Sequence, residues 1–234
     1  MTEWQPPASS SAKESVRSDA SFMTRHDLSS QLDAAVIHDV KNRLAILAGE
    51  LSRLNALDMP PELRRHATIA DEQVRHITRK LVEYLTLRRA ADPGGLRADS
   101  REDTPALLLE ELRDDAVALA GARMEIVLDT AAAPDFWFYD RYLVLLALDS
   151  ALYNALRFAG TRVTLGITPK QDGICFFVRD DGPGVQTTPG SHSTGLGLRV
   201  CEAVAQAHRN KGVHGHSVLR NDPAGGAIFE LHLP

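Results

Sequence analysis

Two segments of the chain carry apolar residues in alternating steps of four and three, and a pair of prolines separates them. The first series is Val40, Leu44, Leu47, Leu51 and Leu54, and the second is Leu63, Ala67, Ala70, Val74, Ile77, Leu81 and Tyr84. This spacing is typical of the seam of a coiled coil or helical bundle. Proline is tolerated at the start of a helix but not in its interior, so Pro60 and Pro61 predict a tight connection. The pattern therefore predicts an antiparallel helical hairpin over residues 26–90.

A single hairpin of this kind would leave the apolar seam of each helix half exposed. Two hairpins that pair into a four-helix bundle would bury both seams, so we expect a homodimer. The segment before the hairpin is rich in Ser, Pro and charged residues. Its apolar content is too low to offset the entropy lost on ordering, and we expect residues 1–25 to form a disordered tail.

The second half of the chain has a different pattern. Residues 91–105 contain proline, paired glycines and mixed charge without periodicity, which predicts a linker. Beyond it, helices are expected over 106–120, 141–158 and 198–207, and strands over 124–128, 162–167, 174–178, 216–220 and 227–233. Helices with one apolar face beside strands that pair with each other favour a two-layer α/β sandwich over residues 106–234. The sequence thus predicts an α+β protein of two domains.

Charge and composition restrict the possible partners. The net charge is −5, and residues of both signs are interspersed along the chain. This pattern argues against nucleic acid as the main partner, because phosphate neutralisation needs clustered Lys and Arg. No apolar stretch approaches the ~20 residues of a membrane-spanning helix, so we expect a cytoplasmic protein with no membrane span. Cys175 and Cys201 lie in apolar segments and are interpreted as buried thiols. His208, His214 and His216 lack a Cys or carboxylate partner at ligand spacing, which favours a structural interpretation over a metal site.

A short polar segment interrupts the first helix of the hairpin, where His38 is followed by Asp39 and Asn42. Val36, Val40 and Leu44 define the apolar face, so His38 should face solvent. Asn42 lies one turn further along the same face. A neutral imidazole can attack a phosphoryl group when a nearby carboxylate orients the ring and accepts its proton, a role for which Asp39 is placed. An ordinary solvated helix face is the alternative interpretation.

His38-Asp39-x-x-Asn42 resembles the H-box of sensor histidine kinases, in which the histidine is autophosphorylated. In that family an acidic neighbour assists the transfer, and an acidic residue followed three positions later by Asn forms a phosphatase motif that orients a water molecule. The resemblance implies that His38, Asp39 and Asn42 are catalytic residues of a protein-histidine kinase with phosphatase activity. It also implies that a response regulator receiver domain is the partner.

The segment from Asp149 to Ala155 resembles the N-box of the same family, whose closing Asn coordinates magnesium. The resemblance implies that Asn154 is the Mg²⁺ ligand of an ATP site. Arg157 lies three residues further along the same helix and is expected to approach the phosphates. The chain departs from the family at Ser150, where another Asn or an acidic residue is usual.

Asp180-x-Gly182-x-Gly184 follows an apolar strand and resembles the G1 box. The resemblance implies that Asp180 accepts a hydrogen bond from the adenine amino group, while Gly182 and Gly184 let the backbone pass close to the base. A dinucleotide-binding fingerprint is excluded because the glycine spacing is wrong, and a P-loop is excluded because no Gly-Lys-Ser/Thr follows.

The segment Thr194-Gly195-Leu196-Gly197 opens a helix and resembles the G2 box, with Ser193 in place of the usual first glycine. Backbone N–H groups at a helix N-terminus form a phosphate cradle, so these four residues are expected to contact ATP. Only nine residues separate Gly184 from Thr194, and none is Phe. We therefore expect a short ATP lid and weak ATP affinity.

The resemblance extends from about residue 28 to the closing strand, which ends in Leu233-Pro234. It implies a histidine kinase-like ATPase fold of the Bergerat or GHKL type, with ATP and Mg²⁺ as cofactors. Two alternatives stay open: a histidine phosphotransfer relay whose ATP-binding domain is degenerate, and a GHKL-type regulatory binding module. The segment before the hairpin is too short to sense a signal, so input is expected from a separate sensor or regulatory protein, from a ligand of the ATP-binding domain, or from neither.

Overall fold

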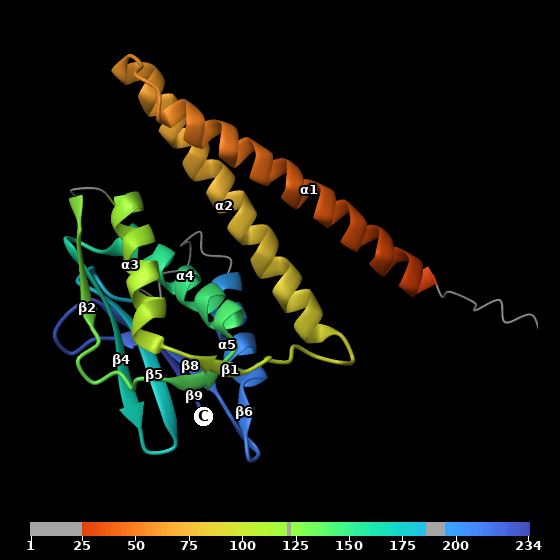
Figure 1. Cartoon of the computed structure of the whole chain (residues 1–234), viewed down its shortest axis with the longest axis vertical. Helices are drawn as coiled ribbons and strands as arrows, with labels where there is room; N and C mark the ends of the chain where they lie inside the picture. The colour runs from red at the N-terminus through yellow and green to blue at the C-terminus, as the bar shows by residue number, and fades with distance from the viewer. Residues whose placement is uncertain (1–24, 121–122, 186–194) are drawn as a thin grey trace, which may run out of the picture. The chain divides into compact units, whose positions relative to one another are not determined.

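The structure is a computed structural model that describes residues 25–120, 123–185 and 195–234, with side chains from residue 39 onwards (Figure 1). Apart from Arg25, the tail expected over residues 1–25 lies outside the described residues, and so does most of the expected ATP lid. Within the described ranges, none of the helices is both long and apolar enough to cross a membrane.

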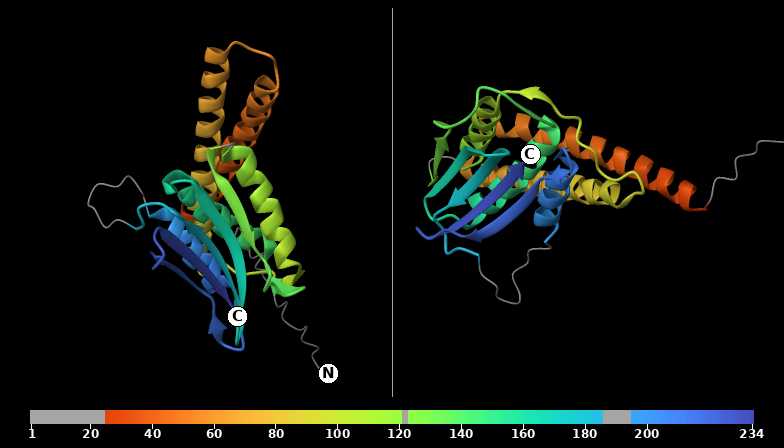
Figure 2. Two further views of the ribbon diagram at one scale, coloured as in Figure 1. Left: turned by 90° about the vertical axis from the view of Figure 1, so that its left-hand side faces the viewer. Right: turned by 90° about the horizontal axis from the view of Figure 1, so that it is seen from below.

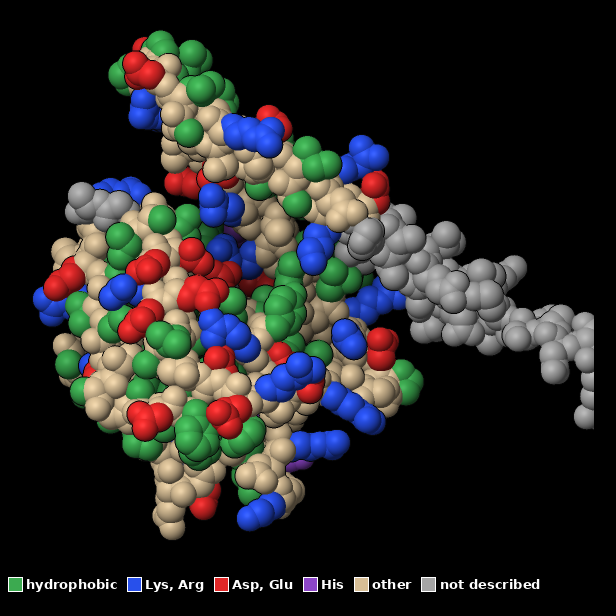
Figure 3. Space-filling view, in the orientation of Figure 1, with side chains coloured by type: hydrophobic (Ala, Val, Ile, Leu, Met, Phe, Trp, Pro, Cys, Tyr) green, Lys and Arg blue, Asp and Glu red, His purple; other side chains and the backbone are tan. Residues whose placement is uncertain are grey.

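The two helices predicted from the heptad pattern are present. Helix α1 spans Arg25–Asn55 and helix α2 spans Pro61–Ala91, with Pro61 in its first turn. Ala67 and Val74 of the second apolar series are buried. Other seam residues are between 43% and 59% exposed, namely Leu47, Leu54, Leu63, Ile77 and Tyr84. Hydrophobic side chains are also visible on the surface of these helices in Figure 3. The single chain therefore leaves much of the seam uncovered.

Residues 46–234, which include α2, form one compact unit built around a five-stranded sheet. The strands are β2 (Glu125–Asp129), β4 (Arg162–Lys170), β5 (Gly173–Asp180), β9 (Ala227–Leu233) and β8 (His216–Asn221), in this spatial order (Figure 1). β2 pairs with β4 in parallel, and every other pair is antiparallel. The register places Val178 of β5 between Leu165 of β4 and Phe229 of β9.

Three helices pack on one face of this sheet: α3 (Pro105–Ala120), α4 (Arg141–Phe158) and α5 (Leu196–Ala207) (Figures 1 and 2). Alternate strand residues face them and are buried, for example Leu165, Phe176 and Leu231. These side chains form one core with Leu108 of α3 and Leu148 of α4. Because strand side chains point alternately to opposite faces, the residues between them lie on the other side of the sheet. The expected two-layer α/β sandwich is confirmed.

Two pairs of short strands were not expected. β1 (Arg101–Asp103) pairs with β3 (Trp137–Tyr139), and β6 (Arg209–Asn210) pairs with β7 (Val213–His214). The linker predicted over residues 91–105 is therefore not structureless, because it contains β1. The buried Tyr139 donates a hydrogen bond to Asp103 at 2.9 Å, and Arg141 forms an ion pair with the same carboxylate at 2.7 Å. A strand of three residues is too short to produce a recognisable alternation.

Candidate active site

Helix α4 carries the first residues of the candidate site. Its N-terminus is capped by Asp140, whose carboxylate accepts a hydrogen bond from the Leu143 amide at 3.1 Å. Asn154 and Arg157 are exposed on the second half of the helix, while Ser150, one turn before Asn154, is buried. The side chains predicted to hold Mg²⁺ and phosphate are thus accessible. Their role depends on the segments that pack beside them.

The first turn of α5 lies directly against this part of α4. Gly195 caps α5 with a left-handed φ of 66°, which favours glycine. A Cβ atom added to Gly197 would lie 2.6 Å from the Ser150 hydroxyl and 3.8 Å from the amide nitrogen of Asn154. The close approach requires glycine at position 197. It also brings the start of α5 beside Asn154, and free N–H groups at a helix start can bind phosphate. Thr194 lies outside the described residues.

The loop after β5 meets the end of the same helix. Asp180 is only 9% exposed, and its Oδ1 atom accepts hydrogen bonds from the amides of Gly182 at 2.9 Å and Ala227 at 3.4 Å. A Cβ atom on Gly182 would lie 2.3 Å from the carbonyl oxygen of Phe158. Phe158 is one turn, about 6 Å, beyond Asn154 on α4. The three motifs that are separate in the sequence therefore converge around the second half of α4.

Two adjacent aspartates lie at the end of β5, where Asp180 is the last residue of the strand and Asp181 follows it. The Asp181 carboxylate accepts hydrogen bonds from the amides of Gly160, Thr161 and Arg162 and from the Thr161 hydroxyl, at 2.7–3.1 Å. These bonds, the Arg162 amide foremost, hold the pKa of Asp181 well below its usual range. Asp181 thus stabilises the turn between α4 and β4, and Asp180 is the carboxylate that lies among the glycines.

The residues present fit a nucleotide with its metal ion. Gly182 and Gly197 allow the loop after β5 and the first turn of α5 to pack closely against α4, and the N-terminus of α5 provides N–H groups for phosphate. Mg²⁺ prefers oxygen ligands, and Asn154 supplies a side-chain carbonyl oxygen at the same place. The arrangement can therefore hold adenine near Asp180 and the phosphates near Gly195 and Gly197. Leu196 lies between the two glycines in the first turn of α5.

One residue near this site was not singled out from the sequence. Glu83 of α2 is 1% exposed, and its Oε1 atom accepts a hydrogen bond from the Ser150 hydroxyl at 3.1 Å. Its Oε2 atom forms an ion pair with Lys80 at 2.7 Å. The carboxylate would lie 3.6 Å from a Cβ atom on Gly197. A buried carboxylate thus lies beside the first turn of α5, which is predicted to bind phosphate. The heptad pattern places Glu83 off the seam, so no sequence signal marks it.

Further contacts hold α2 against α4. Arg79 pairs with Asp149 at 2.9 Å, and its guanidinium lies 4.0 Å from the ring centroid of Tyr153, within cation–π range. The Tyr153 hydroxyl lies 3.2 Å from Nδ1 of His76. Arg79 and His76 of α2 therefore contact the helix that carries Asn154.

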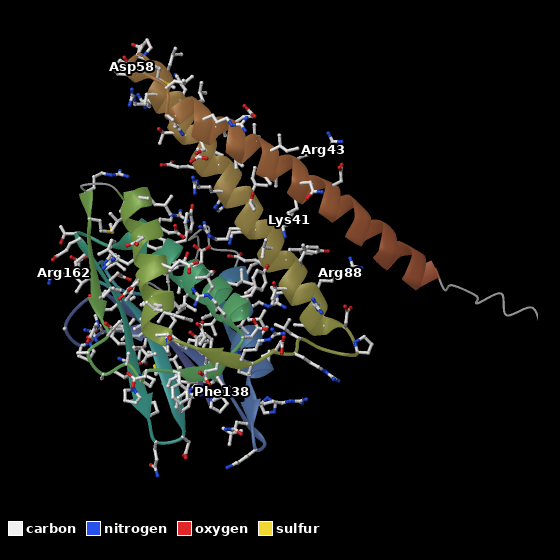
Figure 4. All side chains as sticks on the ribbon, in the orientation of Figure 1. Lys41, Arg43, Asp58, Arg88, Phe138 and Arg162 are labelled. Atoms are coloured by element: carbon white, nitrogen blue, oxygen red, sulfur yellow. The ribbon has the colours of Figure 1, made fainter. Side chains whose placement is uncertain are left out.

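The predicted phospho-acceptor lies in α1. The backbone of His38 is helical, and its side chain is outside the described residues. The Asp39 carboxylate accepts a hydrogen bond from Arg43 at 2.8 Å, and both side chains are exposed. This pair raises the pKa of Arg43. Asn42 is exposed, and Lys41 and Arg43 also project from α1 (Figure 4). The expected roles of His38, Asp39 and Asn42 stay predictions.

Residues 139–234 match the family described as histidine kinase-, DNA gyrase B- and HSP90-like ATPases. The matched range contains every described residue that was predicted to bind nucleotide. A sensor histidine kinase of Escherichia coli K12, CpxA, is 32% identical over 105 residues, which cover 38% of this chain and 22% of that protein. The chain therefore spans less than a quarter of the length of this curated relative.

Two solved structures share the fold. Full-length ShkA in complex with AMPPNP has a TM-score of 0.57 and 20% identity, over 86% of this chain and 45% of that chain. The histidine kinase AdeS of Acinetobacter baumannii has a TM-score of 0.54 and 20% identity, over 84% of this chain and 96% of that chain. At these identities the similarity establishes the fold, and the resemblance first noted in the motifs is confirmed.

Proposed function

We propose that the chain transfers a phosphoryl group from ATP to His38 and then to an aspartate of a response regulator. Residues 139–234 match the histidine kinase-, DNA gyrase B- and HSP90-like ATPases, and the chain is similar to a sensor histidine kinase. The observation that carries the proposal is the convergence of Asp180, Gly182, Gly197 and Asn154 around one helix. These residues come from three separate segments of the sequence, around positions 154, 180 and 197.

Each residue of the site has a distinct task in this proposal. Asp180 accepts a hydrogen bond from the adenine amino group, and the backbone at Gly182 and Gly184 lies close to the base. The amides of Thr194, Gly195, Leu196 and Gly197 bind the phosphates at the start of α5. Asn154 contributes an oxygen ligand to Mg²⁺, and Arg157 offsets phosphate charge. Bound ATP with Mg²⁺ supplies an electrophilic phosphoryl group.

On α1, His38 accepts this group through an imidazole nitrogen, and Asp39 orients the ring and takes its proton. The ion pair between Asp39 and Arg43 holds the carboxylate along the helix face. Asn42 orients a water molecule for hydrolysis of the phosphorylated regulator, which makes the protein a phosphatase as well. The receiver domain docks on the surface that includes Lys41 and Arg43.

The exposed apolar seam of α1 and α2 supports a homodimer. Leu47, Leu54, Leu63 and Ile77 are large apolar side chains in contact with solvent in the single chain. A second copy would cover them in a four-helix bundle. Light scattering tests the dimer: Leu47→Glu should halve the mass, whereas Leu219→Glu, on β8, should leave it unchanged.

The kinase reaction is tested by incubating the purified chain with Mg²⁺ and γ-labelled ATP. We expect a protein-bound label that is labile in acid and stable in base. His38→Ala and Asp180→Ala should both abolish it, whereas His66→Ala, a change of an exposed histidine on α2, should not. A label that survives His38→Ala would overturn the assignment of the acceptor.

The two alternative functions give different results in the same assay. A phosphotransfer relay would bind no ATP and take up no label from it, yet His38 would accept a phosphoryl group from a phosphorylated receiver domain. A GHKL-type regulatory binding module would bind ATP without phosphorylating His38. The convergence of the glycines with Asn154 favours the kinase over the relay, and the helical hairpin that carries His38 favours it over the binding module.

A further inference from the structure

The face of the sheet opposite the three helices carries a cluster of ligand-type side chains. Cys175 of β5 is paired directly with His232 of β9, and Glu230 lies two residues before His232 on the same face. Their neighbours Phe176 and Leu231 point to the opposite side, into the core. We propose that Cys175, Glu230 and His232 bind a divalent transition metal ion of the class that accepts sulfur and nitrogen ligands, represented by Zn²⁺.

The distances between the donor atoms suit such an ion. One ligand atom from each of the three residues lies within 4.8 Å of the other two, and Sγ of Cys175 is 3.8 Å from Nε2 of His232. Tetrahedral zinc, with bonds of ~2.3 Å to sulfur and ~2.0 Å to nitrogen, places these two atoms ~3.5 Å apart. A shift of a few tenths of an ångström would therefore allow both to coordinate one ion.

The donor set selects the kind of metal. A thiolate and an imidazole favour zinc and related transition metals, whereas Mg²⁺ and Ca²⁺ prefer oxygen ligands alone. The proposed site therefore differs in chemistry from the Mg²⁺ site expected at Asn154, and it lies on the opposite face of the sheet from α4. Among the residues that the structure describes, this is the one group of three such side chains close enough to share an ion.

Neighbouring side chains hold two of the ligands in place. The His216 ring of β8 stacks on His232 with centroids 4.3 Å apart and planes 7° from parallel. Parallel stacked rings cannot both point a nitrogen at the same ion, so His216 orients His232 and leaves the fourth coordination position to water. Arg220 donates a hydrogen bond to Oε2 of Glu230 at 3.0 Å and fixes that carboxylate. Such supporting contacts are typical of metal ligands.

The chain provides its own control for the thiol. Cys201 is also buried, but it lies in the helix-side core and its Sγ contacts the carbonyl oxygen of Ala147 at 3.4 Å. It belongs to no such cluster within the described residues. A change to serine at either position removes one buried thiol, and only the change at Cys175 removes a proposed ligand. The comparison therefore separates metal binding from a general effect of losing sulfur.

The test is a titration of the tag-free, chelator-treated chain with Co²⁺, followed by competition with Zn²⁺. We expect one equivalent of Co²⁺ to produce an absorption band from sulfur-to-metal charge transfer, and Zn²⁺ to abolish it. Cys201→Ser should retain the band and Cys175→Ser should lose it. His232→Ala, which keeps the thiol, should weaken Co²⁺ binding at least tenfold.

Binding should release a proton from the thiol and tighten as pH rises. It should persist in His38→Ala and Asp180→Ala, because the site does not depend on the proposed kinase reaction. Circular dichroism checks that each variant is folded before the titration. Absence of the band in the unmodified chain, or an equal band in folded Cys175→Ser, would overturn the proposal.

Discussion

The hydroxyl of Ser150 donates a hydrogen bond to the buried carboxylate of Glu83 across the contact between α4 and α2, at 3.1 Å. The same carboxylate approaches the position of a Cβ atom on Gly197 to 3.6 Å, at the turn proposed to bind phosphate. A carboxylate at this place would repel a phosphate bound at the turn. Lys80 offsets part of this repulsion.

We therefore expect Glu83→Gln to bind ATP several-fold more tightly than the unmodified chain, because the amide keeps an acceptor for Ser150 and removes the negative charge. Titration with a fluorescent ATP analogue measures the effect. The matched control is Glu72→Gln, an exposed position on the same helix, which should leave the affinity unchanged. Weaker binding by Glu83→Gln would show that the carboxylate assists nucleotide binding instead of opposing it.

Gly197→Ala should lower both stability and ATP affinity. Its Cβ atom would lie 2.6 Å from the Ser150 hydroxyl, so α5 must move away from α4, at a cost of about 1–3 kcal/mol. Urea unfolding and ATP titration measure the two effects. Gly49→Ala, which meets no atom within 4 Å, is the control and should not destabilise the chain.

A second substitution distinguishes this steric effect from a loss of glycine flexibility. Ser150→Ala removes the hydroxyl that the new methyl group would meet, so the double variant should recover part of the lost stability and affinity. If Gly197→Ala is equally destabilising with and without the hydroxyl, the close packing of α5 on α4 is not the reason for glycine at this position.

Asp180→Asn and Asp181→Asn should have opposite consequences. Asp181 fixes the turn at residues 160–162, so its loss should destabilise the protein by about 1–2 kcal/mol after allowance for screening by solvent. Asp180→Asn should unfold at nearly the same urea concentration as the unmodified chain and lose ATP binding.

The effect at Asp181 should depend on pH. The pKa of Asp181 is lower in the folded state than in the unfolded state. The stabilisation that Asp181 provides is therefore complete above its unfolded-state pKa of ~3.9, and it is lost as the pH falls below that value. Urea unfolding of the two proteins at pH 7 and at acidic pH checks this: the stability difference between Asp181→Asn and the unmodified chain should shrink below about pH 4. A constant difference would contradict the assigned cause.

His208 should make the protein less stable in mild acid. Its Nε2 atom accepts a hydrogen bond from the Asp140 amide at 3.0 Å, and Nδ1 lies 2.8 Å from the Val204 carbonyl oxygen. Burial lowers the pKa of His208, so the unfolded chain binds a proton at a higher pH than the folded one. The stabilisation of the fold by neutral His208 is therefore complete above the unfolded-state pKa of ~6.5, and it declines as the pH falls below that value.

Urea unfolding between pH 7.5 and pH 5 tests this dependence, and His208→Gln should flatten it. The exposed His66 has no such environment, so His66→Gln should leave the pH profile as it is in the unmodified chain. An unchanged profile in His208→Gln would mean that another group is responsible, for example His232, whose pKa burial also lowers.

The helices and the longer strands could be predicted from the sequence because their signals are local. The heptad steps and the paired prolines predicted α1 and α2, and the span of α4 was predicted at its observed bounds, Arg141–Phe158. An apolar period or a cap involves residues within one or two turns of each other. The motifs around Asn154, Asp180 and Gly197 could be recognised for the same reason, since each is a short continuous segment.

Contacts between distant segments were decided only by the tertiary structure. The sequence alone singled out Asp180 but gave no role for Asp181, and it gave no indication that Glu83 would meet Ser150 or that Cys175 would lie beside His232. The sequence analysis considered His208, His214 and His216 as ligands and did not single out His232. Strand order and register bring such residues together, because pairing between strands depends on the packing of the whole sheet and leaves no periodic signal at any single position.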